Sequence, residues 1–163
     1  MTNFFNKTDL SRNDAEKIIS ETLNNCDDGE LYLENSKSES IVLDDDKIKS
    51  STYSSDLGYG LRAVTGEVVA YSHSNEISKN SLKQSADNLS STLKSKKGVY
   101  NHEIPKTNGQ FYKNINPIEE KSLQSKLELL KEVNNYTRAK SGIVQQVTAS
   151  FSGEHKSIEI IRS

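Results

Sequence analysis

Apolar residues recur every three or four positions in three stretches of the chain, and this spacing predicts three α-helices. We expect the first helix over residues 12–25, capped by Ser11, the second from about Ser78, and the third over residues 122–140. Their apolar faces are expected to comprise Ala15, Ile18, Ile19 and Leu23; Leu82, Ala86, Leu89 and Leu93; and Leu123, Leu127, Leu130 and Val133. Each helix therefore has one face that can pack against another layer.

Between the first two helices the period of the pattern falls to two, which is typical of β-strands. Residues 30–74 predict a meander of antiparallel strands, with separate strands over 48–56 and 57–64. A tight turn at Thr65-Gly66 would join the strand over 57–64 to a hairpin partner. A second, acidic turn is expected at residues 44–46. One face of the sheet is expected to be covered and the other open, because alternate positions are polar.

The chain ends in a second strand-forming stretch. Residues 143–152 and 157–161 predict two strands joined around Gly153. Residues 96–117, which hold both prolines, predict an irregular connection before the third helix. The order of elements predicts an α+β fold in which an antiparallel sheet packs with three helices, and the length suits a single domain over residues 1–163.

Composition and net charge limit the kinds of molecule that we expect this protein to bind. The formal net charge is −2 and the basic residues follow no stripe, which argues against nucleic-acid binding. No stretch approaches the roughly 20 apolar residues of a membrane span, and the first residues lack the apolar run of a signal peptide. Cys26 is the single cysteine, so an intrachain disulfide is excluded and a reducing compartment is favoured. We therefore expect a cytoplasmic protein with neither nucleic-acid nor membrane partners.

Two motifs match part of a known site but lack the rest of its pattern. Residues 58–63, with Gly58 and Gly60, have the spacing of a dinucleotide-binding loop, which needs a helix to begin within the match. Here the strand pattern continues, so we interpret both glycines as allowing a bulge or a close backbone approach. His102-Glu103 could open a zinc-binding helix, but no second histidine follows one turn later. The sequence therefore predicts no catalytic residue and no metal ligand in this chain.

Four segments carry a resemblance to a known family. They are Gly29-Glu-Leu-Tyr-Leu-Glu34, Ser38-Glu-Ser-Ile-Val-Leu-Asp44, Asp56-Leu-Gly-Tyr-Gly-Leu-Arg-Ala-Val-Thr-Gly-Glu67 and Gln146-Val-Thr-Ala-Ser-Phe-Ser-Gly153. Together they resemble the amino-terminal domain of the TldD/PmbA family, long labelled modulators of DNA gyrase. The resemblance spans nearly the whole chain, in order and without large gaps. It is most specific over residues 55–67 and 145–153.

The resemblance implies a cytoplasmic zinc metallopeptidase that degrades unfolded or extended peptides as a TldD–TldE heterodimer. In the family the metal-binding H-E-x-x-x-H helix lies in a carboxy-terminal domain, so zinc is expected in the full-length enzymes and not in this chain. We expect a truncated TldD-like enzyme, inactive by itself, whose domain helps to form the subunit interface and the peptide channel. Its candidate structural or channel-framing residues are Gly58, Gly60, Arg62 and Gly66.

Two other functions stay open at this point. The chain could be a stand-alone module that binds peptides or pairs with a TldE/PmbA-like subunit. A self-sufficient enzyme is disfavoured, because the sequence offers no device that would activate a water molecule. The last strand carries Ile158, Ile160 and Ile161, and we expect this apolar surface to bind a TldE/PmbA-like subunit or a second copy of the chain. The open face of the sheet over residues 30–74 is a second candidate for this surface.

Overall fold

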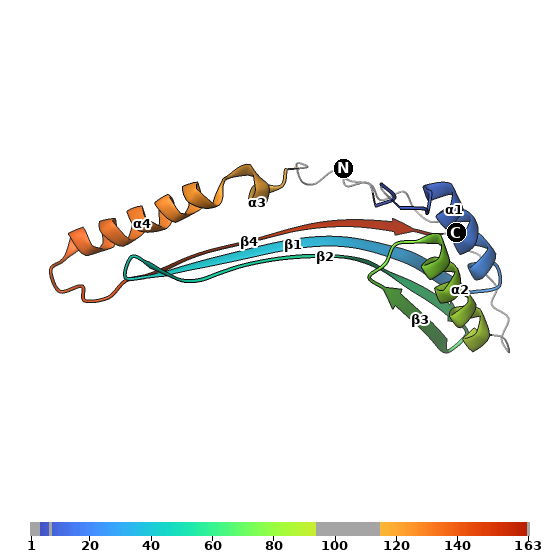
Figure 1. Ribbon diagram of the computed structural model, residues 1–163. Coiled ribbons are helices and arrows are strands. Elements are labelled where there is room, and N and C mark those ends of the chain that lie inside the picture. Colours follow the sequence, from blue (N-terminus) through green and yellow to red (C-terminus); the bar gives the residue numbers. More distant parts are fainter. Residues whose placement is uncertain (1–3, 7, 94–114, 163) are drawn as a thin grey trace. The chain divides into compact units, whose positions relative to one another are not determined.

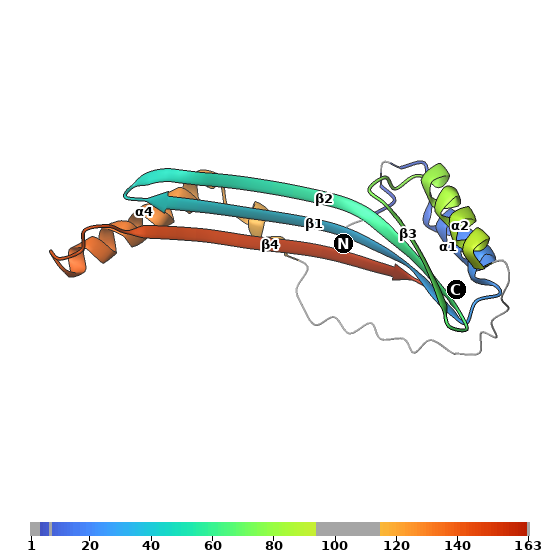
Figure 2. The same ribbon diagram turned by 90° about the horizontal axis from the view of Figure 1, so that it is seen from below.

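The computed structural model describes residues 4–6, 8–93 and 115–162. Four strands form an antiparallel sheet in the order β3-β2-β1-β4 (Figure 1, Figure 2). The strands are β1 (Asp28–Asp44), β2 (Lys47–Thr65), β3 (Val68–Ser74) and β4 (Thr148–Ile161). The helices are α1 (Arg12–Leu23), α2 (Lys79–Leu93), α3 (Pro117–Glu120) and α4 (Leu123–Lys140). The predicted α+β class is confirmed.

The chain divides into two compact units. The large unit contains the described residues of 1–35, 56–112 and 157–163, and the small unit contains those of 36–55 and 113–156. Strands β1, β2 and β4 each contribute residues to both units, whereas α1, α2 and β3 belong to the large unit and α3 and α4 to the small one.

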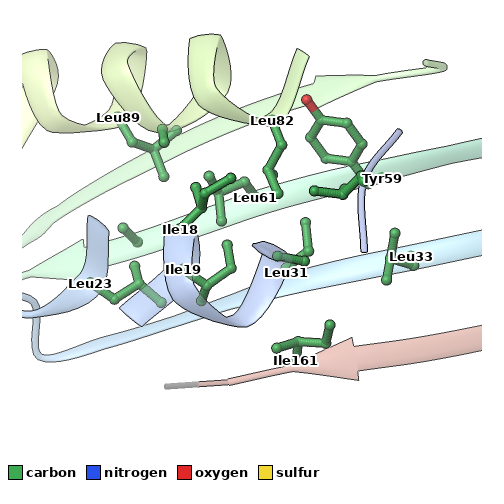
Figure 3. Close-up of a cluster of buried hydrophobic side chains, with 14 of the residues drawn as sticks. Ile18, Ile19, Leu23, Leu31, Leu33, Tyr59, Leu61, Leu82, Leu89 and Ile161 are labelled. Atoms are coloured by element: carbon green, nitrogen blue, oxygen red, sulfur yellow. The ribbon is translucent and has the colours of Figure 1, made fainter. Parts of the chain in front are cut away.

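In the large unit, α1 and α2 cover one face of the sheet (Figure 1). Leu31 of β1 and Leu61 of β2 are fully buried beneath them, and Figure 3 shows both side chains pointing towards Ile19 of α1 and Leu82 of α2. Helix α1 begins where the sequence predicts, because the Ser11 hydroxyl accepts a hydrogen bond from the first-turn backbone N–H at residue 14. The predicted apolar faces of α1 and α2 are therefore the faces that form this core.

Both predicted turns are present. Strands β2 and β3 pair from Tyr59 opposite Ser74 to Thr65 opposite Val68, and Gly66 in the connecting turn has a φ of +59°. Asp45 and Asp46, which connect β1 to β2, have φ values of 44° and 66°. Positive φ at both central residues is what a two-residue hairpin turn needs to match the twist of its strands, and aspartate tolerates it better than most residues. The acidic run is thus a structural turn.

Several predicted strand ends are wrong. Residues 48–56 and 57–64 belong to one continuous strand, β2, and the two predicted strands around Gly153 form a single strand, β4. Residues 143–147 precede that strand. Pairing along neighbouring strands satisfies the backbone groups of polar and glycine residues, so the ladder continues through positions of weak intrinsic strand preference.

The structure has a fourth helix that the sequence pattern does not predict. Helix α3 begins at Pro117, where Asn116 accepts a hydrogen bond from the N–H of Ile118 at 3.1 Å. Proline suits the first position of a helix because its missing N–H would have no partner there. The predicted irregular connection over 96–117 otherwise lies, up to residue 114, outside the described residues.

Helix α4 has the predicted length but a different buried face. Its buried residues are Lys126, Leu130 and Asn134, whereas the predicted Leu123 and Val133 are 53% and 44% exposed. Leu130 packs in a small core with Ile41, Leu43 and Ala149. Lys126 can be buried because its ammonium group donates to Glu39 at 2.5 Å and to the Ile118 carbonyl at 2.6 Å.

Candidate functional site

The face of the large unit's sheet that lies away from α1 and α2 has no helix packed on it among the described residues of that unit, and we call it the open face. Alternation along each strand places on it the residues that do not point into the core. They include Glu30, Tyr32 and Glu34 of β1; Gly58, Gly60 and Arg62 of β2; Val69, Tyr71 and His73 of β3; and Ile158 and Ile160 of β4. About half or more of the surface of Val69, Tyr71, Ile158 and Ile160 is exposed.

The predicted apolar end of β4 is thus only partly exposed. Ile158 and Ile160 lie on the open face, as expected, with exposed fractions of 50% and 49%. Ile161 points the other way and is buried in the core with the helices (Figure 3). The expectation that all three isoleucines form one apolar surface is wrong, because adjacent residues of a strand point to opposite faces.

A depression of about 220 Å³ lies on the open face, lined by parts of β1, β2 and β3 and by the residue that follows β3. Its lining includes Tyr32, Glu34, Asp56, Gly58, Gly60 and Tyr71. A Cβ atom on Gly60 would come within 2.5 Å of the Tyr71 hydroxyl, and one on Gly58 would come within 2.7 Å of the Ser74 carbonyl oxygen. The two glycines therefore let the Tyr71 ring and the end of β3 approach β2 closely.

Among the described lining residues of the depression, the charged side chains are both carboxylates, those of Glu34 and Asp56. The Tyr32 hydroxyl donates to Glu34 at 2.5 Å, and this hydrogen bond, together with burial, raises the pKa of Tyr32 to about 12. The phenol therefore keeps its proton at neutral pH and remains a donor to the carboxylate. Asp56 adds a second carboxylate, and no described residue forms an ion pair with it. None of the described lining residues is basic.

Arg62 and Gly66, two of the four candidate residues, do not line the depression. Arg62 lies farther along the same face of β2, where it pairs with Asp28 and lies 3.7 Å from Glu30. Glu30 also accepts a hydrogen bond from Arg162 at 2.7 Å, so charges of alternating sign cross β2, β1 and the residue after β4. Gly66 lies in the hairpin turn, where its N–H donates to Asp27 at 2.6 Å.

The described residues include no group of three histidine, cysteine, aspartate or glutamate side chains that could hold a metal ion. His73 is in β3, as predicted, and its ring stacks on Tyr71 with centroids 5.8 Å apart. His155 lies within β4 and not in the predicted turn. The predicted His102-Glu103 lies outside the described residues. The described part of the chain thus does not fit the zinc site of a metallopeptidase.

The sequence could have pointed to some of the lining residues. Tyr32 and Glu34 alternate with Leu31 and Leu33, which places them on the face opposite the core. Tyr71 could not be placed beside Gly60 in this way, because that neighbourhood depends on the register of β2 and β3.

None of the α-helices among the described residues has the length and apolar content needed to span a bilayer.

Comparison with known proteins connects this fold to one family. Residues 29–93 match the model of the PmbA/TldA metallopeptidase domain 1. A metalloprotease TldD homologue of Buchnera aphidicola (subspecies Acyrthosiphon pisum) is 35% identical over 133 residues, which are 81% of this chain and 28% of the relative. The homologue of Haemophilus influenzae is 33% identical over 143 residues, which are 84% of this chain and 29% of the relative.

Solved structures show the same fold at lower identity. A Bacteroides thetaiotaomicron protein, named for a proposed role as a modulator of DNA gyrase, matches with a TM-score of 0.65 and 17% identity over 93% of this chain and 36% of its own. TldE from Thermococcus kodakarensis matches with a TM-score of 0.56 and 14% identity over 90% of this chain and 34% of its own. The chain spans less than a third of the length of the curated relatives described above.

Proposed function

Because the chain carries the amino-terminal domain of the TldD/PmbA family, we propose that it works within a TldD-type zinc metallopeptidase, where it helps to pair subunits and to form the channel for unfolded peptides. The zinc and the catalytic residues of such an enzyme belong to its carboxy-terminal domain. The chain by itself would then neither bind zinc tightly nor cleave peptides. We place this activity in the cytoplasm, as the family resemblance implies.

The observation that carries this proposal is the match to two curated metalloprotease homologues over more than four fifths of the chain. Identities of 35% and 33% run over both units and not only over the segment that matches the family model. The match covers only 28–29% of each relative, which fits a role in one part of a larger enzyme.

The open face supports a role in pairing subunits. Val69, Tyr71, Ile158 and Ile160 expose apolar surface on strands at both edges of the sheet. Between them lie Arg62 and Glu30, whose charges can specify which partner docks. Exposed apolar surface that is gathered on one face often marks a protein interface. We propose a TldE/PmbA-like subunit as the partner, with a second copy of the chain as the weaker alternative.

The glycines support a role in framing the channel. Gly58 and Gly60 shape the depression, and Arg62 and Gly66 hold β1 and the β2–β3 hairpin in place through their contacts with Asp28 and Asp27. An extended peptide can add to a sheet edge through main-chain hydrogen bonds, with side-chain pockets providing preference. We propose these four residues as structural elements of the channel, none of them catalytic.

Co-expression with a TldE-type subunit, followed by sedimentation at several concentrations, tests the subunit role. We expect a complex with that subunit and weak self-association without it. The double variant Ile158→Lys/Ile160→Lys should weaken both, because it places charges in the apolar surface, whereas Lys17→Glu on the exposed surface of α1 serves as a control. A chain that stays monomeric and captures no such subunit would contradict the proposal.

A zinc and peptidase assay tests the catalytic part. We expect the dialysed chain to retain no stoichiometric zinc and to release no products from an unfolded peptide, because the described residues hold no ligand set. Chelator-sensitive hydrolysis by the chain alone would overturn this part of the proposal and leave the subunit role to be judged by sedimentation.

A further inference from the structure

We propose that helix α4 pairs in antiparallel orientation with α4 of a second copy of the chain. The contact is made by Leu129, Val133 and Tyr136, which we call the apolar stripe. The inference goes beyond the proposed function, because the apolar stripe belongs to the small unit, whereas the proposed subunit contact lies on the open face of the large unit.

The exposed surface of α4 is apolar on one side and polar on the other. Leu129, Val133 and Tyr136 follow one another at intervals of four and three residues, so they lie one above the other on the helix surface. Their exposed fractions are 49%, 44% and 64%, and the small core contacts α4 through Leu127 and Leu130 instead. The exposed positions 124, 128, 131 and 135 have the same spacing and hold Gln, Glu, Lys and Asn. Apolar exposure is therefore concentrated in the stripe.

The contacts of α4 show which way the apolar stripe faces. On one side of the helix Arg138 pairs with Asp45 in the β1–β2 turn, and on the other Lys126 lies over the ring of Phe151 in β4. The stripe residues follow Lys126 after three, seven and ten residues, a spacing that keeps them on its side of the helix. The stripe therefore lies on the β4 side of α4. Since β4 is the last strand of the sheet, no strand of the described residues lies beyond it.

The charges beside the apolar stripe favour an antiparallel copy of α4 as its partner. Glu132 and Lys140 are exposed and border the stripe. When Val133 of one copy lies opposite Tyr136 of the other, Lys140 comes opposite Leu129 of the other copy, within one helical turn of Glu132. The apolar stem of Lys140 can then cover Leu129 while its ammonium group reaches Glu132. Two-fold symmetry makes this contact twice, whereas a parallel pair would bring like charges together.

The end of the stripe is already arranged for this contact. The Lys140 ammonium lies 4.4 Å from the centroid of the Tyr136 ring, which keeps its charge beside the apolar stripe. The antiparallel dipoles of the two helices add to the attraction. One helix side is smaller than the roughly 800 Å² per partner of a stable interface, so we expect weak pairing, with a dissociation constant on the order of 100 µM.

Amide NMR spectra of the isotope-labelled full chain at increasing concentration test the inference. Between about 10 µM and about 1 mM, which brackets the expected dissociation constant, the amide signals of residues 129–140 should shift progressively. Val133→Lys should abolish these shifts, because it places a charge in the centre of the stripe. Gln124→Lys adds the same charge on the polar side of α4 and should leave them unchanged. Signals of α4 that stay constant over the whole range would overturn the proposal.

Charge exchange tests the antiparallel arrangement. Glu132→Lys and Lys140→Glu should each weaken pairing about tenfold, because each brings like charges together in both symmetric contacts. An equimolar mixture of the two variants should pair as the unchanged chain does, because every lysine at these positions then meets a glutamate. Glu128→Lys, on the polar side of α4, is the matched control and should have no effect. A mixture that pairs no better than either variant would overturn the arrangement.

The outcome is separable from that of the proposed function, because NMR assigns each contact to its element. Self-association through the open face would shift signals of β3 and of the end of β4, and Ile158→Lys/Ile160→Lys should remove those shifts and keep the ones in α4. Capture of a TldE-type subunit without concentration-dependent shifts in α4 would refute the pairing of α4 and leave the subunit role standing. If Val133→Lys also abolished that capture, the stripe would belong to the TldE-type subunit and not to a second copy.

Discussion

The large unit and the small unit differ in the size and composition of their apolar cores. In the large unit two helices cover the sheet, and the core is built from aliphatic side chains such as Leu31, Leu61 and Leu82, which are fully buried. In the small unit the apolar core is limited to Ile41, Leu43, Leu130 and Ala149, with Leu127 and Phe151 packed against it. Apolar burial therefore provides much more of the stability of the large unit than of the small unit.

The small unit compensates with polar contacts, of which those of Lys126 are buried. Lys126 is 5% exposed and contacts Glu39, the Ile118 carbonyl and the ring face of Phe151. Asp45 accepts a hydrogen bond from the Val147 N–H at 3.0 Å and pairs with Arg138. Such contacts depend on geometry, whereas apolar contacts tolerate small shifts. We therefore expect the small unit to be the more sensitive to loss of a single polar group.

The largest expected effect comes from Lys126→Met. This change leaves the Glu39 carboxylate buried without its partner, which lowers the free energy of unfolding by about 4 kcal/mol. Hydrogen exchange should show the loss in α4 and in the part of β1 that belongs to the small unit. The double variant Lys126→Met/Glu39→Leu should recover most of the stability. Equal loss of protection in α1 and α2 would mean that the two units do not differ as described.

Leu61→Ala makes the corresponding test in the large unit. Removing this fully buried side chain should lower the free energy of unfolding by about 3 kcal/mol, since both apolar contact and packing are lost. Leu129→Ala on the exposed side of α4 is the matched control, and we expect less than about 1 kcal/mol there. Urea unfolding measures both, and similar losses for the two variants would remove the basis for the comparison.

Alanine substitutions at Gly58 and Gly60 compare how much the fold is destabilised at two positions of the depression. Gly58→Ala should destabilise the chain by about 2 kcal/mol, because its Cβ would come within 2.7 Å of a backbone oxygen of Ser74. Gly60→Ala should have a smaller effect, since the contact there is with the hydroxyl end of Tyr71, an exposed side chain that can move aside. Thermal unfolding checks the order, and the reverse order would contradict the described approach of β3 to Gly58 and Gly60.

Thr65→Val should stabilise the large unit by about 1 kcal/mol. The Thr65 hydroxyl is fully buried and has no hydrogen-bond partner among the described residues, so a methyl group of similar size suits its surroundings better. Thr65→Ser is the control, because it keeps the hydroxyl and removes only a methyl group. A lower melting temperature for the valine variant would show that the hydroxyl has a partner after all.

The smallest expected effect is on the stability of the fold at acidic pH. Hydrogen bonds from Lys79 and from Ser11 lower the pKa of Asp14 to about 2. The pKa is lower in the folded than in the unfolded chain, so the ionised carboxylate contributes stability above about pH 4, and this is lost as the pH falls towards 2. The contribution is small because the group is exposed. Asp14→Asn should flatten this part of the stability profile, and an unchanged profile would show that other carboxylates account for it.

The sequence predicted what local chemistry decides. The Ser11 cap, the helical faces of α1 and α2 and the turn at Gly66 depend on neighbouring residues, and all are confirmed. Continuous pairing of β4 through Gly153 depends on a strand far away along the chain, so it could not be predicted from the local pattern. The buried face of α4 was missed because Lys126 counts as polar until its partners are known.

The same distinction applies to the candidate site. The sequence identified Gly58 and Gly60 as strand glycines, and the structure confirms that they lie within β2. It did not identify Tyr71 or Asp56, because their proximity follows from strand register and from the point where β3 ends. Patterns within one strand can thus predict a face of a sheet, whereas a depression on that face requires the positions of several strands.

The early end of β3 also bears on solubility. Because β3 pairs only with Tyr59–Thr65, the preceding part of β2 has an edge on which no strand of the described residues pairs, and residues 47–57 are all exposed. Open strand edges are templates on which other chains can add and grow into fibres. Lys47 and Lys49, followed by a run of serine and threonine, make this edge a poor template, because charged and well-hydrated side chains resist stacking between copies. The polar composition of this stretch therefore protects the chain against aggregation.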